Sequence, residues 1–262
     1  MIADALYAWT VWQYGALAVM FFFAFFIKGA FGVGSLSPSI LLGSLIIGPH
    51  VAVILALVAN IASQVQFIGP GLRDGDLRLV RSIVVPNFVM TLLGVWIYGS
   101  IDPAPLMIVL GLTLGLVALA EMSGAVVSIA QTHDMTGWLP MSIMSGLAGL
   151  ISGITGAGGI FLVLIVLRVL DLPPRTFRGT VLLLGLVFVG WRFLVMVFAG
   201  HITAGILIQV AVLAPFIVLG GFAGSRLFDR IEGQRFFVWL RILILFAAAA
   251  TIVKGVQALS GT

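Results

Sequence analysis

Clusters of glycine, serine and threonine within otherwise apolar sequence are the first candidates for a functional site. The stretch GITGAGGI, residues 153–160, has four glycines in eight positions and includes Thr155, Gly156, Gly158 and Gly159. Each glycine costs a helix about 1 kcal/mol relative to alanine, and a bilayer tolerates broken backbone only where protein or water covers it. The stretch therefore predicts a helix break, at which backbone amides and the threonine hydroxyl can bind an oxyanion.

A similar cluster lies 124 residues earlier. The stretch KGAFGVGS, residues 28–35, has Gly32 and Gly34 at the positions of two glycines of the later cluster. It leads into Ser35 and Ser37, whose hydroxyls could donate hydrogen bonds to the same anion. The alternative is that these small residues allow helices to pack closely, but two matching clusters favour a binding site.

Two cations lie inside or beside apolar segments. Arg192 lies in VFVGWRFLVMVF, well inside the segment 179–199, and Lys28 directly precedes the first break. A charge inside the membrane is costly and marks a functional site by default, and two cations suit an anionic ligand. Alternatively, Arg192 pairs with helix-end carbonyls or with Glu121, and Lys28 extends to the membrane interface.

Two amide side chains add polarity to the apolar segment 51–69. Asn60 and Gln64 share one face of this segment because they are four residues apart. Both are predicted to bind the ligand, although buried amides can equally join helices. Trp191, next to Arg192, either lines the same cavity or packs against a neighbour.

Other kinds of site are disfavoured. The chain has no cysteine, and His50, His133 and His201 are scattered over predicted turns, so we expect neither a metal nor a cofactor. No strand precedes the glycines, which argues against a dinucleotide site. A hydrolase would need a dyad such as Ser35 with Lys28, and such an enzyme is the weaker alternative.

Composition predicts the fold class. Of 262 residues, 61% are hydrophobic and 8% are charged, against about 25% charged residues in soluble domains. This is the composition of an all-α, multi-pass membrane protein with a single transmembrane domain, residues 1–262. The net charge of +4 fits arginines in cytoplasmic loops, so we expect no nucleic-acid partner. The N-terminus lacks a basic region, so no cleaved signal peptide is expected.

The apolar segments form two predicted repeats, residues 14–122 and 138–258. Six segments are long enough to span a bilayer, at about 51–69, 79–99, 105–122, 179–199, 203–224 and 236–258. The segments that flank the glycine clusters are shorter, at about 14–27, 35–47, 138–152 and 159–170. Each repeat thus has one broken helix pair and three long helices.

Arginine placement predicts how the repeats are related. Arg73, Arg78 and Arg81 lie in one loop of the first repeat, whereas the equivalent residues 200–204 have no arginine, and two further pairs of loops are opposed in the same way. Because arginines favour the cytoplasmic side, the repeats are predicted to be inverted, with both termini outside. The cytoplasmic loops are then 70–80, 123–137, 171–178 and 225–235. The alternative is eight crossings, by conventional counting, with parallel repeats.

Several stretches resemble the sulfite exporter TauE/SafE family. They are GAFGVGS, GITGAGGIF, FRGTVLLL and LAPFIVLGGFAGSRLFDRI, and the similarity covers essentially the whole chain. The resemblance implies about eight transmembrane segments in duplicated halves. It also implies a carrier of sulfite, organosulfonates or related small anions in the cytoplasmic membrane. The chain departs from the family pattern at Val163 and Leu164, where a proline is usual, and at Lys28 in the first break.

The predicted function is therefore a secondary transporter, not an enzyme, that moves a small oxyanion such as sulfite or an organosulfonate by alternating access. The two clusters would hold the anion, and Arg192 and Lys28 would supply countercharge. A coupling proton is left open, since no deep carboxylate suggests its carrier. An anion channel is the main alternative, and a structural protein without transport is another. The direction of transport, the coupling ion and the oligomeric state are not predicted.

Overall fold

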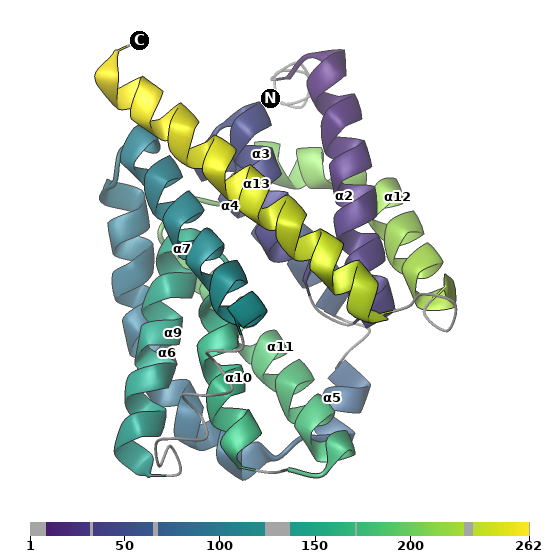
Figure 1. The fold of residues 1–262 in the computed structure, drawn as a ribbon, viewed down its shortest axis with the longest axis vertical. Helices are drawn as coiled ribbons and strands as arrows, with labels where there is room; N and C mark the ends of the chain where they lie inside the picture. The colour runs from purple at the N-terminus through teal and green to yellow at the C-terminus, as the bar shows by residue number, and fades with distance from the viewer. Residues whose placement is uncertain are drawn as a thin grey trace.

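Every regular element that the structure describes is an α-helix (Figure 1). The computed structural model describes residues 9–31, 34–64, 68–123, 137–170, 172–227 and 233–261. Within these ranges seven helices are long and apolar enough to cross a membrane, so the chain is a multi-pass membrane protein. They are α2 (Val11–Phe31), α6 (Leu77–Ser100), α7 (Pro103–Ser123), α9 (Trp138–Thr155), α11 (Pro174–Phe198), α12 (Ala204–Leu227) and α13 (Gly233–Ser260).

Shorter helices complete the described fold. They are α3 (Leu36–Ile47), α4 (Pro49–Gln64), α5 (Ile68–Asp74) and α10 (Gly159–Val169). The helices α3 and α10 are the second members of two broken pairs, α2–α3 and α9–α10, as the glycine clusters predicted. The segment 51–69 was expected to be one helix. The structure describes α4 as far as Gln64 and α5 from Ile68, and residues 65–67, which decide whether the two are continuous, lie outside the described residues.

The first members of the broken pairs are longer than predicted. The helix α2 has 21 residues and α9 has 18, whereas the segments 14–27 and 138–152 were expected to be too short to span a bilayer. The expectation was wrong because it ended each helix at the first glycine of its cluster. Gly29 and Gly153 remain helical, and each helix continues for two residues beyond its glycine.

Another helix lies directly against each of those two glycines. A Cβ at Gly29 would clash with the carbonyl oxygen of Gly221 on α12, and a Cβ at Gly153 would lie 2.8 Å from the Cα of Gly94 on α6. Small residues allow this close approach of backbones in membranes. The first helix of each broken pair is therefore packed by glycine against a long helix from the other half of the chain.

Both broken pairs turn back on themselves. The side-chain amide of Gln13, at the start of α2, donates to the carbonyl oxygen of Ile46, near the end of α3, with an N···O distance of 3.2 Å. In the second pair a Cβ at Gly159 would clash with the carbonyl oxygen of Ala148, so α10 begins beside the body of α9. Each pair is thus a helical hairpin with a glycine-rich turn.

Contacts at the helix ends define two faces of the molecule. On the first, the backbone amide of Asp76 donates to Thr180 Oγ1 at 2.9 Å, which joins the start of α6 to the start of α11. On the second, Tyr98 near the end of α6 contacts His50 and His201. We call these the arginine face and the Tyr98 face. The arginine face has the exposed residues Arg73, Arg78, Arg81, Arg175 and Arg178.

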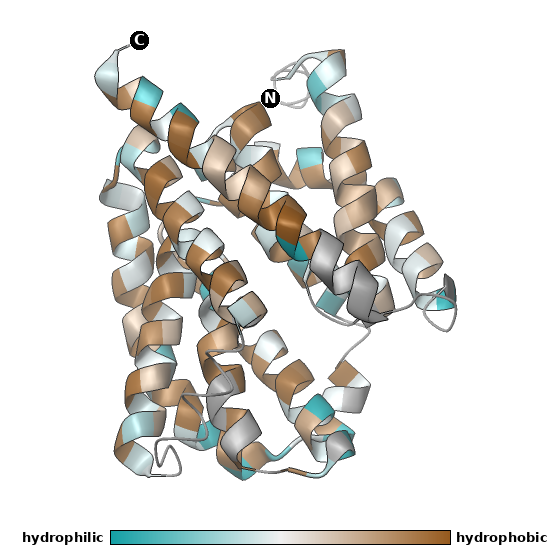
Figure 2. Ribbon diagram, viewed as in Figure 1, coloured by the Kyte–Doolittle hydropathy of each residue, from teal (hydrophilic) through white to brown (hydrophobic). Residues whose placement is uncertain are grey.

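Hydrophobic residues, drawn in brown, occur along all of the long helices (Figure 2), and many large apolar side chains are exposed on the outside, as a lipid environment requires. Trp96, Leu116 and Phe246 are among the strongly exposed ones. Buried polar side chains instead lie within the bundle, and Lys28 and Arg192 are both only 3% exposed. The protein therefore directs its polarity inward, where a site for a polar ligand can form.

The glycine contact between α6 and α9 makes a prediction for stability. Gly94→Ala should lower the thermal midpoint in detergent, because its Cβ would lie 2.6 Å from the carbonyl oxygen of Leu150, and overpacking costs about 1–3 kcal/mol. Gly190→Ala is the matched control, since a Cβ there meets nothing within 4 Å and alanine is the better helix former by up to about 1 kcal/mol. Equal midpoints for the two variants would contradict the close α6–α9 contact.

Candidate functional site

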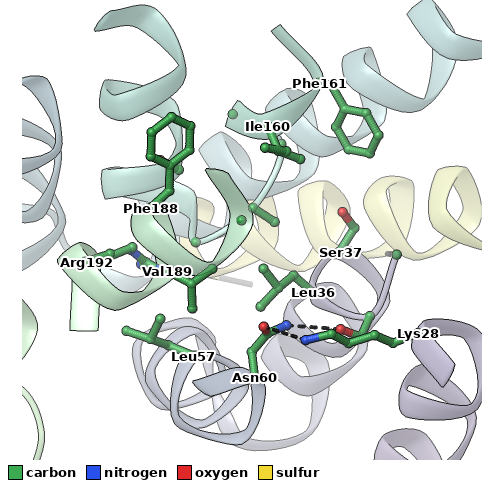
Figure 3. A pocket seen from close by; sticks show the side chains of 18 of the residues that line it. Lys28, Leu36, Ser37, Leu57, Asn60, Ile160, Phe161, Phe188, Val189 and Arg192 are labelled. Atoms are coloured by element: carbon green, nitrogen blue, oxygen red, sulfur yellow. Dashed lines mark hydrogen bonds between the residues drawn. The ribbon is translucent and has the colours of Figure 1, made fainter. Parts of the chain in front are cut away.

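A cavity of about 140 Å³ lies between the two broken helix pairs. Such a volume has room for several water molecules or a small anion. Its walls come from the end of α2, the start of α3, the second half of α4, the glycine turn at 156–158, the start of α10 and α11. Figure 3 shows Arg192 and Lys28 on opposite sides of this cavity.

Most of the site residues predicted from the sequence line this cavity together. They are Lys28, Gly34, Ser35, Ser37, Asn60, Gln64, Gly156, Gly158, Gly159 and Arg192. Gly32 lies outside the described residues. Thr155 is buried but does not line the cavity. Residues far apart in the chain thus meet in one place, although their contact with a ligand stays a prediction.

The second helix break, between α9 and α10, is a turn with a defined backbone conformation. Gly156 and Gly158 have φ angles of +85° and +87°, a conformation that glycine adopts without strain. The hydroxyl of Thr155 lies 2.8 Å from the carbonyl oxygen of Ile151 and 2.7 Å from that of Ala157. Thr155 therefore fastens the end of α9 to the turn, and its contact with a ligand stays a prediction.

The start of α10 presents backbone amides to the cavity. The first hydrogen bond of this helix runs from the amide of Phe161 to the carbonyl oxygen of Gly158 at 3.1 Å. The amides of Gly159 and Ile160 precede that bond, so the helix itself offers them no acceptor. Both residues line the cavity, and the positive end of the helix dipole favours an anion there.

Arg192 brings a full positive charge to the same wall. Its Nη2 donates to the carbonyl oxygen of Gly153, near the end of α9, over a long 3.4 Å. Its Nε and Nη1 are buried and have no hydrogen-bond partner among the described residues. Pairing of Arg192 with a helix-end carbonyl, one of the alternatives from the sequence, is therefore observed at Gly153. Pairing with Glu121 is not tested, because the side chain of Glu121 lies outside the described residues. The remaining donors of the guanidinium are available to a ligand.

Lys28 is fixed by a buried polar network. Its Nζ donates to Asn60 Oδ1 at 2.9 Å and to Ser63 Oγ at 2.6 Å. Asn60 in turn donates through Nδ2 to Ser35 Oγ at 3.1 Å. Asn60 joins helices, as one alternative had it, because its amide connects Lys28 on α2 and Ser35 at the start of α3 to α4. It also lines the cavity, and its contact with a ligand stays a prediction. Snorkelling of Lys28 to the interface is wrong, because the side chain points into this network and is 3% exposed.

The apolar walls of the cavity were missed by sequence reasoning. Leu36, Leu57, Phe188 and Val189 lie around it (Figure 3). Phe188 could have been found, because it precedes Arg192 by four residues on the same helix and so shares its face.

Trp191 lies away from the cavity. It packs against a neighbour, which was the second of the two alternatives considered for it. Its ring stacks on Phe88 with centroids 4.4 Å apart, and its Nε1 donates to the carbonyl oxygen of that residue at 3.1 Å.

Among the described residues no group of three or more histidines and carboxylates is placed so that it could hold a metal ion. His133 lies outside the described residues.

Comparison with known proteins gives one match. A family model described as Sulfite exporter TauE/SafE matches residues 17–252, which is most of the chain. No curated protein and no solved structure is significantly similar. The matched range includes all of the second broken pair, the first pair from residue 17 onward, and every residue that lines the cavity.

The network around Asn60 makes a prediction. Asn60→Ala removes the acceptor of Lys28 and the donor to Ser35, and a buried polar group left without a partner costs about 1–3 kcal/mol. The thermal midpoint should fall, whereas Ser100→Ala, which removes an exposed hydroxyl on α6, should leave it nearly unchanged. Differential scanning fluorimetry in detergent measures both, and an unchanged midpoint for Asn60→Ala would show that the network is not formed.

Proposed function

The chain belongs to the sulfite exporter TauE/SafE family, and on that premise we propose that it is a secondary transporter that carries a small sulfur oxyanion by alternating access. Membership in the family makes it a membrane transporter of sulfur anions and not an enzyme. The proposal adds the carrier mechanism, the binding site between the broken helix pairs and the cytoplasmic membrane as its location.

The observation that carries the proposal is the buried, incompletely bonded Arg192. A guanidinium held out of water with two unpartnered nitrogens is costly, and an anion that accepts from them removes that cost. Its planar fork suits two oxygens of a sulfite or sulfonate group. The amides at the start of α10 lie on the same cavity and add donors without adding charge.

The apolar walls favour the organic members of this substrate class. Leu36, Leu57 and Phe188 could surround a short carbon chain, while Arg192 holds the sulfonate group. Inorganic sulfite would use the polar wall alone. We therefore propose an organosulfonate first and sulfite second, with Lys28 supplying further positive charge to the cavity.

Packing between the two halves supports the inverted repeat that alternating access requires. In the first half α2 packs against α12, and in the second half its counterpart α9 packs against α6. The helix α2 begins at the Tyr98 face, where Gln13 meets Ile46. By contrast, α9 runs in the same direction as α6, since Asn87 meets Gly149 and Gly94 meets Gly153, and so starts from the arginine face. Figure 1 shows α2 and α9 running in opposite directions.

Movement of the broken pairs against the other helices would then alternate access. Arg192 on α11 contacts Gly153 on α9, so a ligand that takes over a donor of the guanidinium loosens one link between these helices. No aspartate or glutamate is among the lining residues that the structure describes. The proposal therefore names no acidic proton carrier, and exchange or uniport of the anion fits this lining equally well.

The first test is the thermal midpoint of the purified protein with sulfite, sulfoacetate, taurine, sulfate and acetate. A ligand of the folded state at about 100 times its Kd stabilises by about 2.7 kcal/mol, so one sulfur oxyanion should raise the midpoint. Arg192→Ala should abolish that shift, and Arg192→Lys should restore only part of it because a point charge replaces the fork.

Transport separates a carrier from an anion channel. In proteoliposomes a carrier should show saturable uptake of the stabilising anion and counterflow driven by unlabelled anion inside. Continuous conductance without counterflow would support a channel instead. A midpoint that no anion raises, or a shift that Arg192→Ala leaves intact, would remove this arginine from the site.

A further inference from the structure

The cavity does not reach the Tyr98 face. On α4 its lining runs from Leu57 to Gln64, the half toward the arginine face, because α4 begins at the Tyr98 face. On α11 the lining runs from Val181 to Arg192 and goes no nearer to the Tyr98 face. An anion bound at Arg192 would therefore have packed protein between it and the Tyr98 face.

Tyr98 lies at the centre of that packed protein. Its side chain is fully buried and is among the largest fully buried side chains of the described chain. The hydroxyl donates to the carbonyl oxygen of His50 at 2.7 Å, and His50 Nε2 lies 3.2 Å from the carbonyl oxygen of Tyr98. The start of α4 and the end of α6 are thus joined by a reciprocal pair of hydrogen bonds.

His201 closes the third side of this cluster. The edge of its ring meets Tyr98, with centroids 5.4 Å apart and an interplanar angle of 87°. Gly99 leaves space for it, because a Cβ there would lie 3.0 Å from His201 Nε2. Burial, and secondly the electrostatic interaction with His50, lower the pKa of His201 from its ordinary value.

A rigid turn connects His201 to the helix that carries Arg192. At the end of α11 the amides of Ala199, Gly200 and His201 donate to the carbonyl oxygens of Val195, Val197 and Met196 at 2.9–3.0 Å. Gly200 has a φ of +76°, as in the turns that commonly end helices. Because the backbone bonds leave this turn little freedom, a shift of α11 at Arg192 also moves His201.

We propose that Tyr98, His50 and His201 form the closed gate between the cavity and the Tyr98 face, with Tyr98 as the residue that must move for an anion to pass. The inference rests on the proposed transport function and adds the position and composition of one gate. The gate joins three elements, α4, α6 and the α11–α12 turn. Parting α11 from α6 breaks the ring contact of His201, and parting α4 from α6 breaks the reciprocal hydrogen bonds.

The absence of cysteine from the chain allows a direct test by accessibility. Val189→Cys places one thiol on the cavity wall. A membrane-impermeant methanethiosulfonate reagent is then added from one side of the membrane at a time. Ser82→Cys and Ser100→Cys, both at exposed positions near opposite ends of α6, identify the arginine face and the Tyr98 face in separate samples.

With the gate intact, the thiol at position 189 should react faster from the arginine face than from the Tyr98 face. Tyr98→Ala should raise the rate from the Tyr98 face by at least about tenfold, which corresponds to about 1.4 kcal/mol of lost closure. His201→Ala and Gly99→Ala should raise it less, because each disturbs one contact. The rate for Tyr98→Phe should lie between that of the intact gate and that of Tyr98→Ala, since phenylalanine keeps the ring and loses the hydroxyl. Trp96→Ala, an exposed residue two positions from Tyr98, is the control and should change nothing.

Two results would overturn the gate. One is an equal rate from both faces before any gate substitution, and the other is a rate from the Tyr98 face that neither Tyr98→Ala nor Gly99→Ala raises. The thermal midpoint of each variant shows whether it is folded. The transport proposal fails separately, if no sulfur oxyanion protects the cysteine at position 189 from the reagent while the gate variants behave as expected.

Discussion

Inside a bilayer no backbone amide or carbonyl can be left facing lipid, and the rest of this structure depends on how its two helix breaks meet that constraint. The chain directs both breaks inward, toward a shared cavity, and fastens them with side chains. Thr155 holds the second break to its helix, and Arg192 reaches the carbonyl oxygen of Gly153. Ser35, after the first break, accepts from Asn60. The polar groups that these contacts leave over are those that a ligand can use.

Glycine has two separate structural roles in these clusters. Close helix packing and a break in the helix, the two explanations considered from the sequence, are found at different positions. Gly29 and Gly153 are helical and allow another helix to touch their backbone. Gly156 and Gly158 have positive φ angles and form the turn itself. Close packing thus holds the first helix of each hairpin in place, while the turn presents the amides at the start of α10. A site of this kind needs both, since amides can be aimed only from a backbone that is held.

The sequence was sufficient to predict the long helices and much of the cavity lining, because hydropathy and spacing report local chemistry. The prediction that Lys28 and Arg192 lie near one ligand depended on the predicted repeat, because only the repeat suggested that the two distant glycine clusters meet. The hydropathy pattern ended α9 at residue 152, before the first glycine of the cluster, whereas the helix continues to Thr155 and ends where Gly156 adopts a positive φ. The sequence could not assign Tyr98 either, since a tyrosine near a helix end is typical of membrane interfaces. Its burial depends on His201, which follows it by about a hundred residues.

The partial bonding of Arg192 fits what the proposed carrier site would have to do. A buried aspartate beside it would satisfy the guanidinium, but it would also occupy the donors that an anion needs. The described cavity lining has no such carboxylate. Each unsatisfied buried group costs about 1–3 kcal/mol, and under the proposed function an anion that binds there would remove that cost. Because α11 connects Arg192 to the turn at His201, the proposed gate would be reached from the proposed site through this one helix, and the next movement of a transport cycle would begin there.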